Sequence, residues 1–128
     1  MPLARIDLMK GKSREYRRTV GDVVYQAMVE ILKAPKDDRF QIITEHDDSN
    51  VIYDPSFRGI NRSENIIFMQ LTLVEGRTLE QKRDFYKRVV GDLNERLRIR
   101  PEDVFISLIG TGRDDWSFGK GEASLVDS

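Results

Sequence analysis

The sequence predicts an α/β (α+β) fold in which two tandem β-α-β units form a four-stranded sheet with two helices on one face. Two observations lead to this prediction: an internal repeat, and a strand–helix–strand pattern in each half of the chain. A crossover helix implies that the two strands of each unit pair in parallel through a right-handed connection. We expect residues 1–128 to form a single domain.

The repeat is seen at Gly11-Lys12-Ser13, which corresponds to Gly76-Arg77-Thr78 at a distance of 65 positions. The same distance relates further pairs without a gap: Leu8 and Leu73, Glu15 and Glu80, Arg18 and Arg83, Val24 and Val89, Glu30 and Glu95, Leu32 and Leu97, Asp38 and Asp103, and Phe40 and Phe105. We interpret residues 1–46 and 66–110 as two copies of one unit. A turn-rich loop, 47–65, joins them, and a polar tail, 111–128, follows.

The first half starts with a strand over residues 3–9, because apolar and other side chains alternate there. Gly11 and Lys12 interrupt this strand, and Ser13 is the expected N-cap of a helix. Pro35 is expected to end the helix, and residues 40–44 form the next strand. The helix is indicated by apolar residues at helical spacing: Tyr16, Val20, Val23, Val24, Ala27, Met28, Ile31 and Leu32.

The second half follows the same plan. Residues 66–74 are strongly β-prone, and Thr78 to Gln81 have the form of a capping box at the start of a helix. Pro101 interrupts the chain, and residues 104–109 form a second apolar strand. The helical stripe consists of Phe85, Tyr86, Val89, Val90, Leu93 and Leu97. Two helices on one face leave the other face of the sheet uncovered, so we expect the protein to oligomerise.

The composition excludes several classes of function. Lys and Arg (21) nearly balance Asp and Glu (22), so no net field favours nucleic acid or an anionic membrane. The lack of cysteine excludes disulfides, thiolate nucleophiles and zinc–thiolate sites. His46, the one histidine, lies after a strand and is assigned no role. The sequence predicts no metal, no cofactor and no membrane span, and the cytoplasm is the expected location.

Four segments, found in this order along nearly the whole chain, resemble the tautomerase superfamily, and within it malonate semialdehyde decarboxylase and its relatives. They are the start Met1-Pro2-Leu3, residues 38–46, the run Gly76 to Lys82, and residues 115–119. The resemblance implies a homotrimer and catalysis by an N-terminal proline that is exposed when the initiator methionine is removed.

The resemblance also implies site residues. In the decarboxylase pattern, an Asp before the second strand and two Arg residues separated by one position complete the site. Asp38 matches the Asp, and Arg77 matches the second Arg. The first Arg has no counterpart, because Val74 and Glu75 lie where it is expected. This departure leaves open which reaction of the superfamily the chain carries out.

Pro2 is the strongest candidate for a catalytic group, although Met-Pro starts are also common in proteins that make no use of them. A prolyl amine whose pKa lies near neutrality serves as a general base or as a nucleophile toward carbonyls. Arg77 lies between a strand and a helix, where a planar guanidinium suits a carboxylate substrate, or it is a surface residue. Asp38 either holds a water or orients the substrate, or else caps the turn into the strand.

Trp116 and Phe118 are predicted to bind substrate as an apolar wall beside Pro2, or to pack the tail onto a neighbouring subunit. We expect a cofactor-independent enzyme that acts on small keto or unsaturated carboxylic acids. Keto–enol proton transfer, hydration and decarboxylation of a β-keto acid all remain open. One alternative is a non-catalytic binding or signalling protein, as the resemblance to macrophage migration inhibitory factor permits. Another is a ferredoxin-like regulatory domain, which strand order would distinguish.

Overall fold

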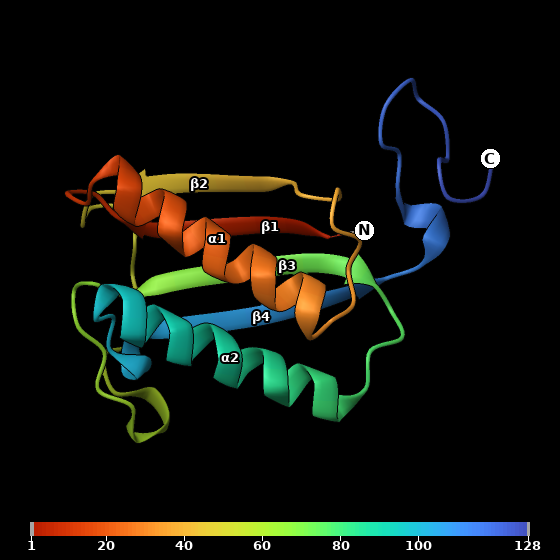
Figure 1. The fold of residues 1–128 in the computed structure, drawn as a ribbon. Helices are drawn as coiled ribbons and strands as arrows, with labels where there is room; N and C mark the ends of the chain where they lie inside the picture. Colours follow the sequence, from red (N-terminus) through yellow and green to blue (C-terminus); the bar gives the residue numbers. More distant parts are fainter. Residues whose placement is uncertain (1, 128) are drawn as a thin grey trace.

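The computed structural model describes residues 2–127 and contains one mixed four-stranded sheet with both long helices on the same side (Figure 1). The strands lie in the order β2-β1-β3-β4. Short 3₁₀ turns occur at Phe57–Gly59, Pro101–Asp103 and Arg113–Asp115. The main elements, in chain order, are β1 Leu3–Met9, α1 Arg14–Glu30, β2 Gln41–His46, β3 Ile67–Val74, α2 Leu79–Leu97 and β4 Val104–Thr111.

The two strands of each unit are direct neighbours in the sheet. β1 pairs in parallel with β2, β3 pairs in parallel with β4, and β1 and β3 join the two units in antiparallel orientation. In a ferredoxin-like split β-α-β arrangement another strand would lie between the two strands of a unit. The ferredoxin-like alternative is therefore wrong, and the prediction of two tandem β-α-β units with helices on one face is confirmed.

The two helices begin in the same way, at equivalent positions of the two units. The side-chain hydroxyl of Ser13 accepts a hydrogen bond from the Tyr16 amide at 3.0 Å, and Thr78 accepts one from the Gln81 amide at 3.1 Å. Both residues satisfy amides of the first helical turn that have no partner within the helix. The capping box predicted at Thr78 is also complete, because the Gln81 side chain accepts a hydrogen bond from the Thr78 amide.

The end of α1 differs from the prediction. The helix ends at Glu30 rather than near Pro35, because Lys33 adopts a left-handed backbone conformation with φ 61° and reverses the chain. Arg98, at the equivalent place after α2, has φ 58°. A left-handed residue commonly ends a helix, although glycine is the usual choice for it. Ile31 therefore contacts the core from the turn that follows the helix.

Two strands also extend beyond their predicted ends. β2 continues to His46, which pairs with Met9, and β4 continues to Thr111, which pairs with Val74. The hydrogen-bonded neighbour sets these limits, so the hydrophobic pattern of a single strand does not reveal them.

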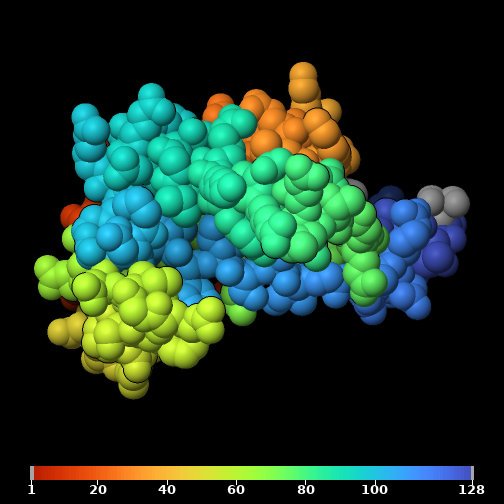
Figure 2. Space-filling model, turned by 90° about the horizontal axis from the view of Figure 1, so that it is seen from below, coloured from red at the N-terminus to blue at the C-terminus, as the bar shows by residue number. Residues whose placement is uncertain are grey.

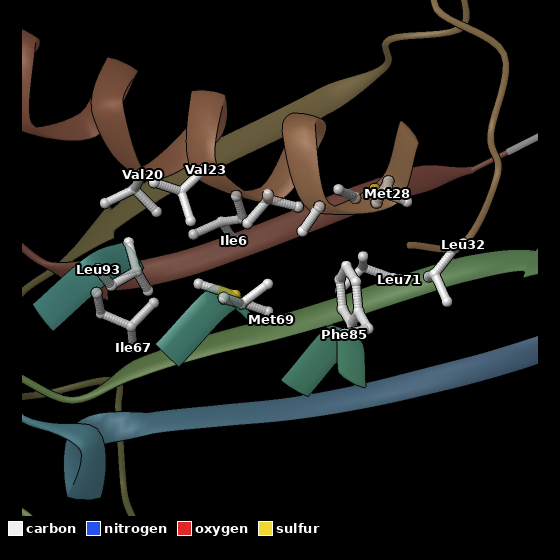
Figure 3. Close-up of a cluster of buried hydrophobic side chains, with 14 of the residues drawn as sticks. Ile6, Val20, Val23, Met28, Leu32, Ile67, Met69, Leu71, Phe85 and Leu93 are labelled. Atoms are coloured by element: carbon white, nitrogen blue, oxygen red, sulfur yellow. The ribbon is translucent and has the colours of Figure 1, made fainter. Parts of the chain in front are cut away.

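The core lies between the two helices and the sheet. Figure 3 shows Phe85 and Leu93 from α2 facing Met69 and Leu71 from β3, with Ile6 of β1 below α1. These five side chains are fully buried. Each contributes about 1.5–3 kcal/mol relative to full exposure, so this layer holds the helices against the sheet.

The opposite side of the sheet is covered by neither α1 nor α2, and we call it the open face (Figure 1). It carries four large apolar side chains, Ile42, Phe68, Phe105 and Ile109; the rings of Phe68 and Phe105 lie 5.4 Å apart. Phe105 is 44% exposed.

The connecting segment and the tail protrude at opposite ends of the molecule (Figure 2). Within residues 2–127, neither helix has the length and apolar character that a bilayer crossing requires.

Candidate active site

One end of the sheet gathers all the predicted site residues. The two strands within each unit are parallel, and the two units are antiparallel to each other. β1 and β2 therefore start at the end of the sheet where β3 and β4 finish. The α1–β2 connection, the β3–α2 connection and the tail lie at this end beside the start of the chain (Figure 1). Pro2 therefore lies beside the end of β3, because the next residue, Leu3, pairs with Thr72.

Pro2 and Asp38 line the same small cavity, and both are buried. The amide of Ala4 donates a hydrogen bond to the Phe40 carbonyl at 3.0 Å, which fixes the start of β1 against the chain that follows Asp38. The remaining lining residues are Tyr25, Met28, Val29, Ala34, Arg39, Phe40 and Gln41. The structure thus brings together two of the three residues that we expected to be catalytic.

Asp38 is a buried carboxyl group that is 7% exposed. Burial raises the pKa of Asp38 above its ordinary value, and the positive charge of the amino terminus acts in the opposite direction. A carboxyl group whose pKa is raised toward neutrality is better suited to exchange protons with a substrate.

The equivalent residue of the second unit, Asp103, has a different environment. It is 1% exposed and accepts hydrogen bonds from the Ser63 amide at 2.7 Å and the Ser63 hydroxyl at 2.6 Å. Arg100 approaches the same carboxylate at 3.5 Å. Asp103 thus anchors the end of the connecting segment, whereas Asp38 lies in the cavity beside Pro2.

Arg39 is a cavity residue that the sequence analysis missed. Its guanidinium lies 4.7 Å from the centre of the Tyr25 ring and forms an ion pair with Asp22 at 2.8 Å. The Tyr25 hydroxyl in turn donates a hydrogen bond to the Lys36 carbonyl. One indication of this role was present in the sequence, because Arg39 directly follows Asp38. The sequence did not indicate that the Arg39 side chain contacts α1.

Arg77 lies at the same end of the sheet but does not line the cavity of Pro2. Its Nε donates a hydrogen bond to the Leu32 carbonyl at 2.9 Å, and its Nη1 donates one to the Val74 carbonyl at 2.8 Å. The side chain therefore joins the turn after α1 to the end of β3. Nη2 makes no hydrogen bond to any other residue in the range 2–127, and its hydrogens remain available to a ligand.

A groove of about 480 Å³ lies beside Arg77 and is lined by no residue of α1, and it too was missed. Glu75, Arg77 and Lys82 supply its charged groups. Its apolar and backbone lining comes from Leu73, Val74, Gly76, Leu108 and Gly110. The residues fall within one ten-residue stretch of sequence, 73–82, plus two positions of β4, so a strand-pairing register was needed to find the groove.

Trp116 and Phe118 lie together in the tail with ring centroids 5.8 Å apart. The indole Nε1 of Trp116 donates a hydrogen bond to the Thr111 hydroxyl at 2.8 Å, and that hydroxyl donates to the Leu73 carbonyl at 3.2 Å. These contacts hold the base of the tail at the site end of the sheet. Neither ring lines the cavity of Pro2 or the groove beside Arg77 in the same chain.

His46 lies at the far end of β2, where its Nε2 is 2.6 Å from the Asp7 carboxylate. No group of three or more potential metal-ligating side chains occurs among the described residues, 2–127.

Comparison with known proteins gives the family. A family model described as tautomerase enzyme matches residues 38–119, and a second one of the same description matches residues 2–57. The chain belongs to the tautomerase superfamily. A curated relative, the probable tautomerase YusQ of Bacillus subtilis (strain 168), is 35% identical over 127 residues, which cover 99% of this chain and 100% of the relative. The probable tautomerase YrdN of the same strain is 32% identical over 98% of this chain and 97% of its own.

Solved structures of the superfamily are also similar to this tautomerase chain. The FG41 malonate semialdehyde decarboxylase inhibited by 3-bromopropiolate is 39% identical, with a TM-score of 0.88 over 97% of this chain and 94% of that one. A second malonate semialdehyde decarboxylase is 30% identical, with a TM-score of 0.87 over 96% and 95%. A fused 4-OT symmetric trimer shares the fold at 19% identity, with a TM-score of 0.79 over 98% and 99%.

Proposed function

We propose that this chain is a cofactor-independent enzyme that uses the amine of Pro2 to move protons on small keto or unsaturated carboxylic acids. The observation that carries the proposal is the buried position of Pro2 beside the buried carboxyl group of Asp38, in one cavity. The similarity to malonate semialdehyde decarboxylases over nearly the full length supports the same class of chemistry.

The amine of Pro2 becomes free only when Met1 is removed, and Met1 lies outside the described residues. An ordinary α-amino group titrates near ~8, and burial disfavours its protonated form and lowers that value. A buried prolyl amine is therefore expected to be a usable base near neutral pH. Its conjugate acid is correspondingly able to return the proton.

Arg77 supplies the substrate anchor in this proposal. A carboxylate bound by the free hydrogens of Nη2 gains a charge-assisted hydrogen bond, which is stronger than a neutral one. The two carbonyl contacts of Nε and Nη1 hold the guanidinium still, so little side-chain freedom is lost on binding. The N-terminus of α2 begins two residues later and adds attraction for an anion.

Three reactions share this arrangement. In tautomerisation, the Pro2 amine takes the enol O–H proton and returns it to carbon, which leaves a ketone. In decarboxylation of a β-keto acid, the bond to the carboxylate breaks, CO₂ leaves, and the electron pair on carbon takes a proton from the Pro2 ammonium. In hydration, Asp38 takes a proton from water as its oxygen adds to the unsaturated carbon, and Pro2 protonates the neighbouring carbon.

The test of this proposal compares two forms of the same chain, one processed to Pro2 and one with Met1 retained. Retention converts the amine to an amide without usable basicity while Asp38 and Arg77 remain in place. We expect the processed form to turn over enol-pyruvates, acetylenic acids or β-keto acids. We expect the retained form to lose activity by at least about 100-fold, the scale of general acid–base catalysis.

Mass spectrometry establishes which terminus each sample carries, and circular dichroism serves as the control for folding. The variant Pro2→Ala keeps a primary amine and is expected to fall between the two forms. Full activity with Met1 verifiably retained would rule out the amine and leave Asp38 as the proton carrier. The absence of turnover in both forms would instead favour the alternative of a non-catalytic binding or signalling protein.

We further propose that the working form is a homotrimer and that the protein acts in the cytoplasm. The uncovered apolar face of the sheet supports assembly, and trimers occur among superfamily members of the same fold. In an assembly, the protruding tail is positioned to bring Trp116 and Phe118 toward the site of a neighbouring copy.

A further inference from the structure

Glu75 lines the groove beside Arg77 from a fixed backbone position. It directly follows the last residue of β3, and its amide donates a hydrogen bond to the Thr111 carbonyl at 2.9 Å. This bond extends the β3–β4 ladder by one residue, so the backbone that carries the carboxylate is part of the sheet. Glu75 is therefore held as firmly as a strand residue, although its side chain is exposed.

The side chain of Glu75 lies across Gly110 of β4. A Cβ atom at position 110 would be only 2.9 Å from the Cγ of Glu75, a distance that real Cβ contacts do not show. The lack of a side chain at Gly110 thus provides the space in which Glu75 lies. The side chain of Glu75 thus lies over β4 and lines the groove.

The charges in the groove are unequal and largely unpaired. Arg77 and Lys82 bring two cations, and Glu75 brings the one anion. Among the described residues, Glu75 forms no ion pair within 4.0 Å with either cation. The carboxylate is therefore not paired directly with either cation of the groove.

We propose that Glu75 is a specificity-determining residue that makes this groove select monocarboxylates with a neutral far end over dicarboxylates. The inference deepens the proposed function and rests on it. Arg77 and Glu75 line the same groove, so we expect a substrate whose carboxylate binds at Nη2 of Arg77 to extend past Glu75. A second carboxylate there would face a like charge, whereas an enol or hydrate hydroxyl would donate a hydrogen bond to Glu75.

The test measures binding of two unreactive probes that differ by one charge, succinate and its monomethyl ester. Each is titrated by NMR against the full chain processed to Pro2, at low ionic strength. Glu75→Gln removes the charge and keeps the shape. We expect it to shift the ratio of the two dissociation constants toward succinate by about 5- to 10-fold, the effect of one like charge several Å away near a surface.

Glu80→Gln is the matched control, because Glu80 is an exposed acid in the first turn of α2 that does not line the groove. It is expected to leave the ratio unchanged. Added salt should reduce the wild-type discrimination, since exposed charges are screened. An unchanged ratio in Glu75→Gln, an equal shift in Glu80→Gln, or no binding of either probe would overturn the assignment. These readouts need no turnover, so failure of the Pro2 mechanism is separately visible.

Discussion

At the residue scale, Arg77 combines a structural contact with a proposed substrate contact. Its Nε and Nη1 hydrogen bonds to the Leu32 and Val74 carbonyls satisfy backbone groups in the turn after α1 and at the end of β3. A charged donor makes a strong hydrogen bond to such a carbonyl. Loss of the side chain should therefore affect both binding and stability.

We expect Arg77→Ala to lower kcat/KM by about 30- to 1,000-fold, the loss of roughly 2–4 kcal/mol of charge-assisted hydrogen bonding. The matched control is Lys12→Ala, at the equivalent place in the first unit, where Nζ lies 5.4 Å from the Tyr16 ring centre. Steady-state kinetics with a carboxylate substrate measures the effect. Chemical denaturation of both variants shows how much of it comes from folding. Equal losses in the two variants would contradict the assignment of Arg77.

The sequence placed Arg77 correctly between a strand and a helix, because Gly76 and the capping box at Thr78 mark that junction. It did not reveal the partner of the guanidinium. The Leu32 carbonyl is 45 positions away, and its availability depends on where α1 ends. A contact of this kind is set by packing of the two units and not by a local pattern.

At the element scale, the two aspartates at equivalent positions of the two units have different environments. Asp103 holds the connecting segment through two hydrogen bonds from Ser63. Asp38 lies in the cavity with Pro2, and burial raises its pKa. Folding therefore disfavours the ionised form of Asp38, whereas the carboxylate of Asp103 accepts hydrogen bonds in the folded state.

We expect opposite effects on stability from the two isosteric variants. Asp103→Asn should cost about 2 kcal/mol at neutral pH, because hydrogen bonds to a charged acceptor are lost. Asp38→Asn should raise the free energy of unfolding at pH 7. This gain in stability should fade as the pH drops through the raised pKa of Asp38 in the folded state. It should disappear below the ordinary pKa of 3.8, where Asp38 is protonated in both the folded and the unfolded state. Urea unfolding at pH 7 and pH 3.5 measures both variants. A loss of stability in Asp38→Asn at pH 7 would contradict this prediction.

The repeat predicted the elements well and their ends less well. Ser13 and Thr78 were identified as N-caps because cap chemistry is local. The end of α1 was misplaced, since no glycine marks the left-handed residue and Lys33 takes that conformation. The strand order depends on pairing of β1 with β3, which the hydrophobic pattern of neither strand specifies.

At the scale of the whole molecule, the open face is the main surface that the fold leaves without a partner. Ile42, Phe68, Phe105 and Ile109 contribute apolar area to it, and the rings of Phe68 and Phe105 pack together. Phe68 and Phe105 pack between β3 and the edge strand β4, which also carries Ile109, whereas Ile42 lies on the opposite edge strand, β2. Exposed apolar side chains on an uncovered face indicate an interaction surface.

We expect Phe105→Glu to shift the protein from trimer to monomer, because assembly would bury the new charge against apolar side chains. Sedimentation velocity at micromolar concentration measures the change. Leu79→Glu is the control, since Leu79 is 61% exposed at the start of α2, on the other side of the sheet. A stable wild-type monomer, or a trimer that tolerates glutamate at position 105, would count against assembly through this face.

The equivalence of the two units has one further consequence, which concerns stoichiometry. Position 67, an isoleucine inside β3, corresponds to Pro2, and its nitrogen is a peptide amide within the chain. A chain has one amino terminus, so joining two units end to end leaves one of two equivalent places without a free amine. In the proposed trimer, six β-α-β units would carry three free prolyl amines. The second unit would contribute Arg77 and Glu75 to the proposed site instead of an amine, and its aspartate, Asp103, binds Ser63.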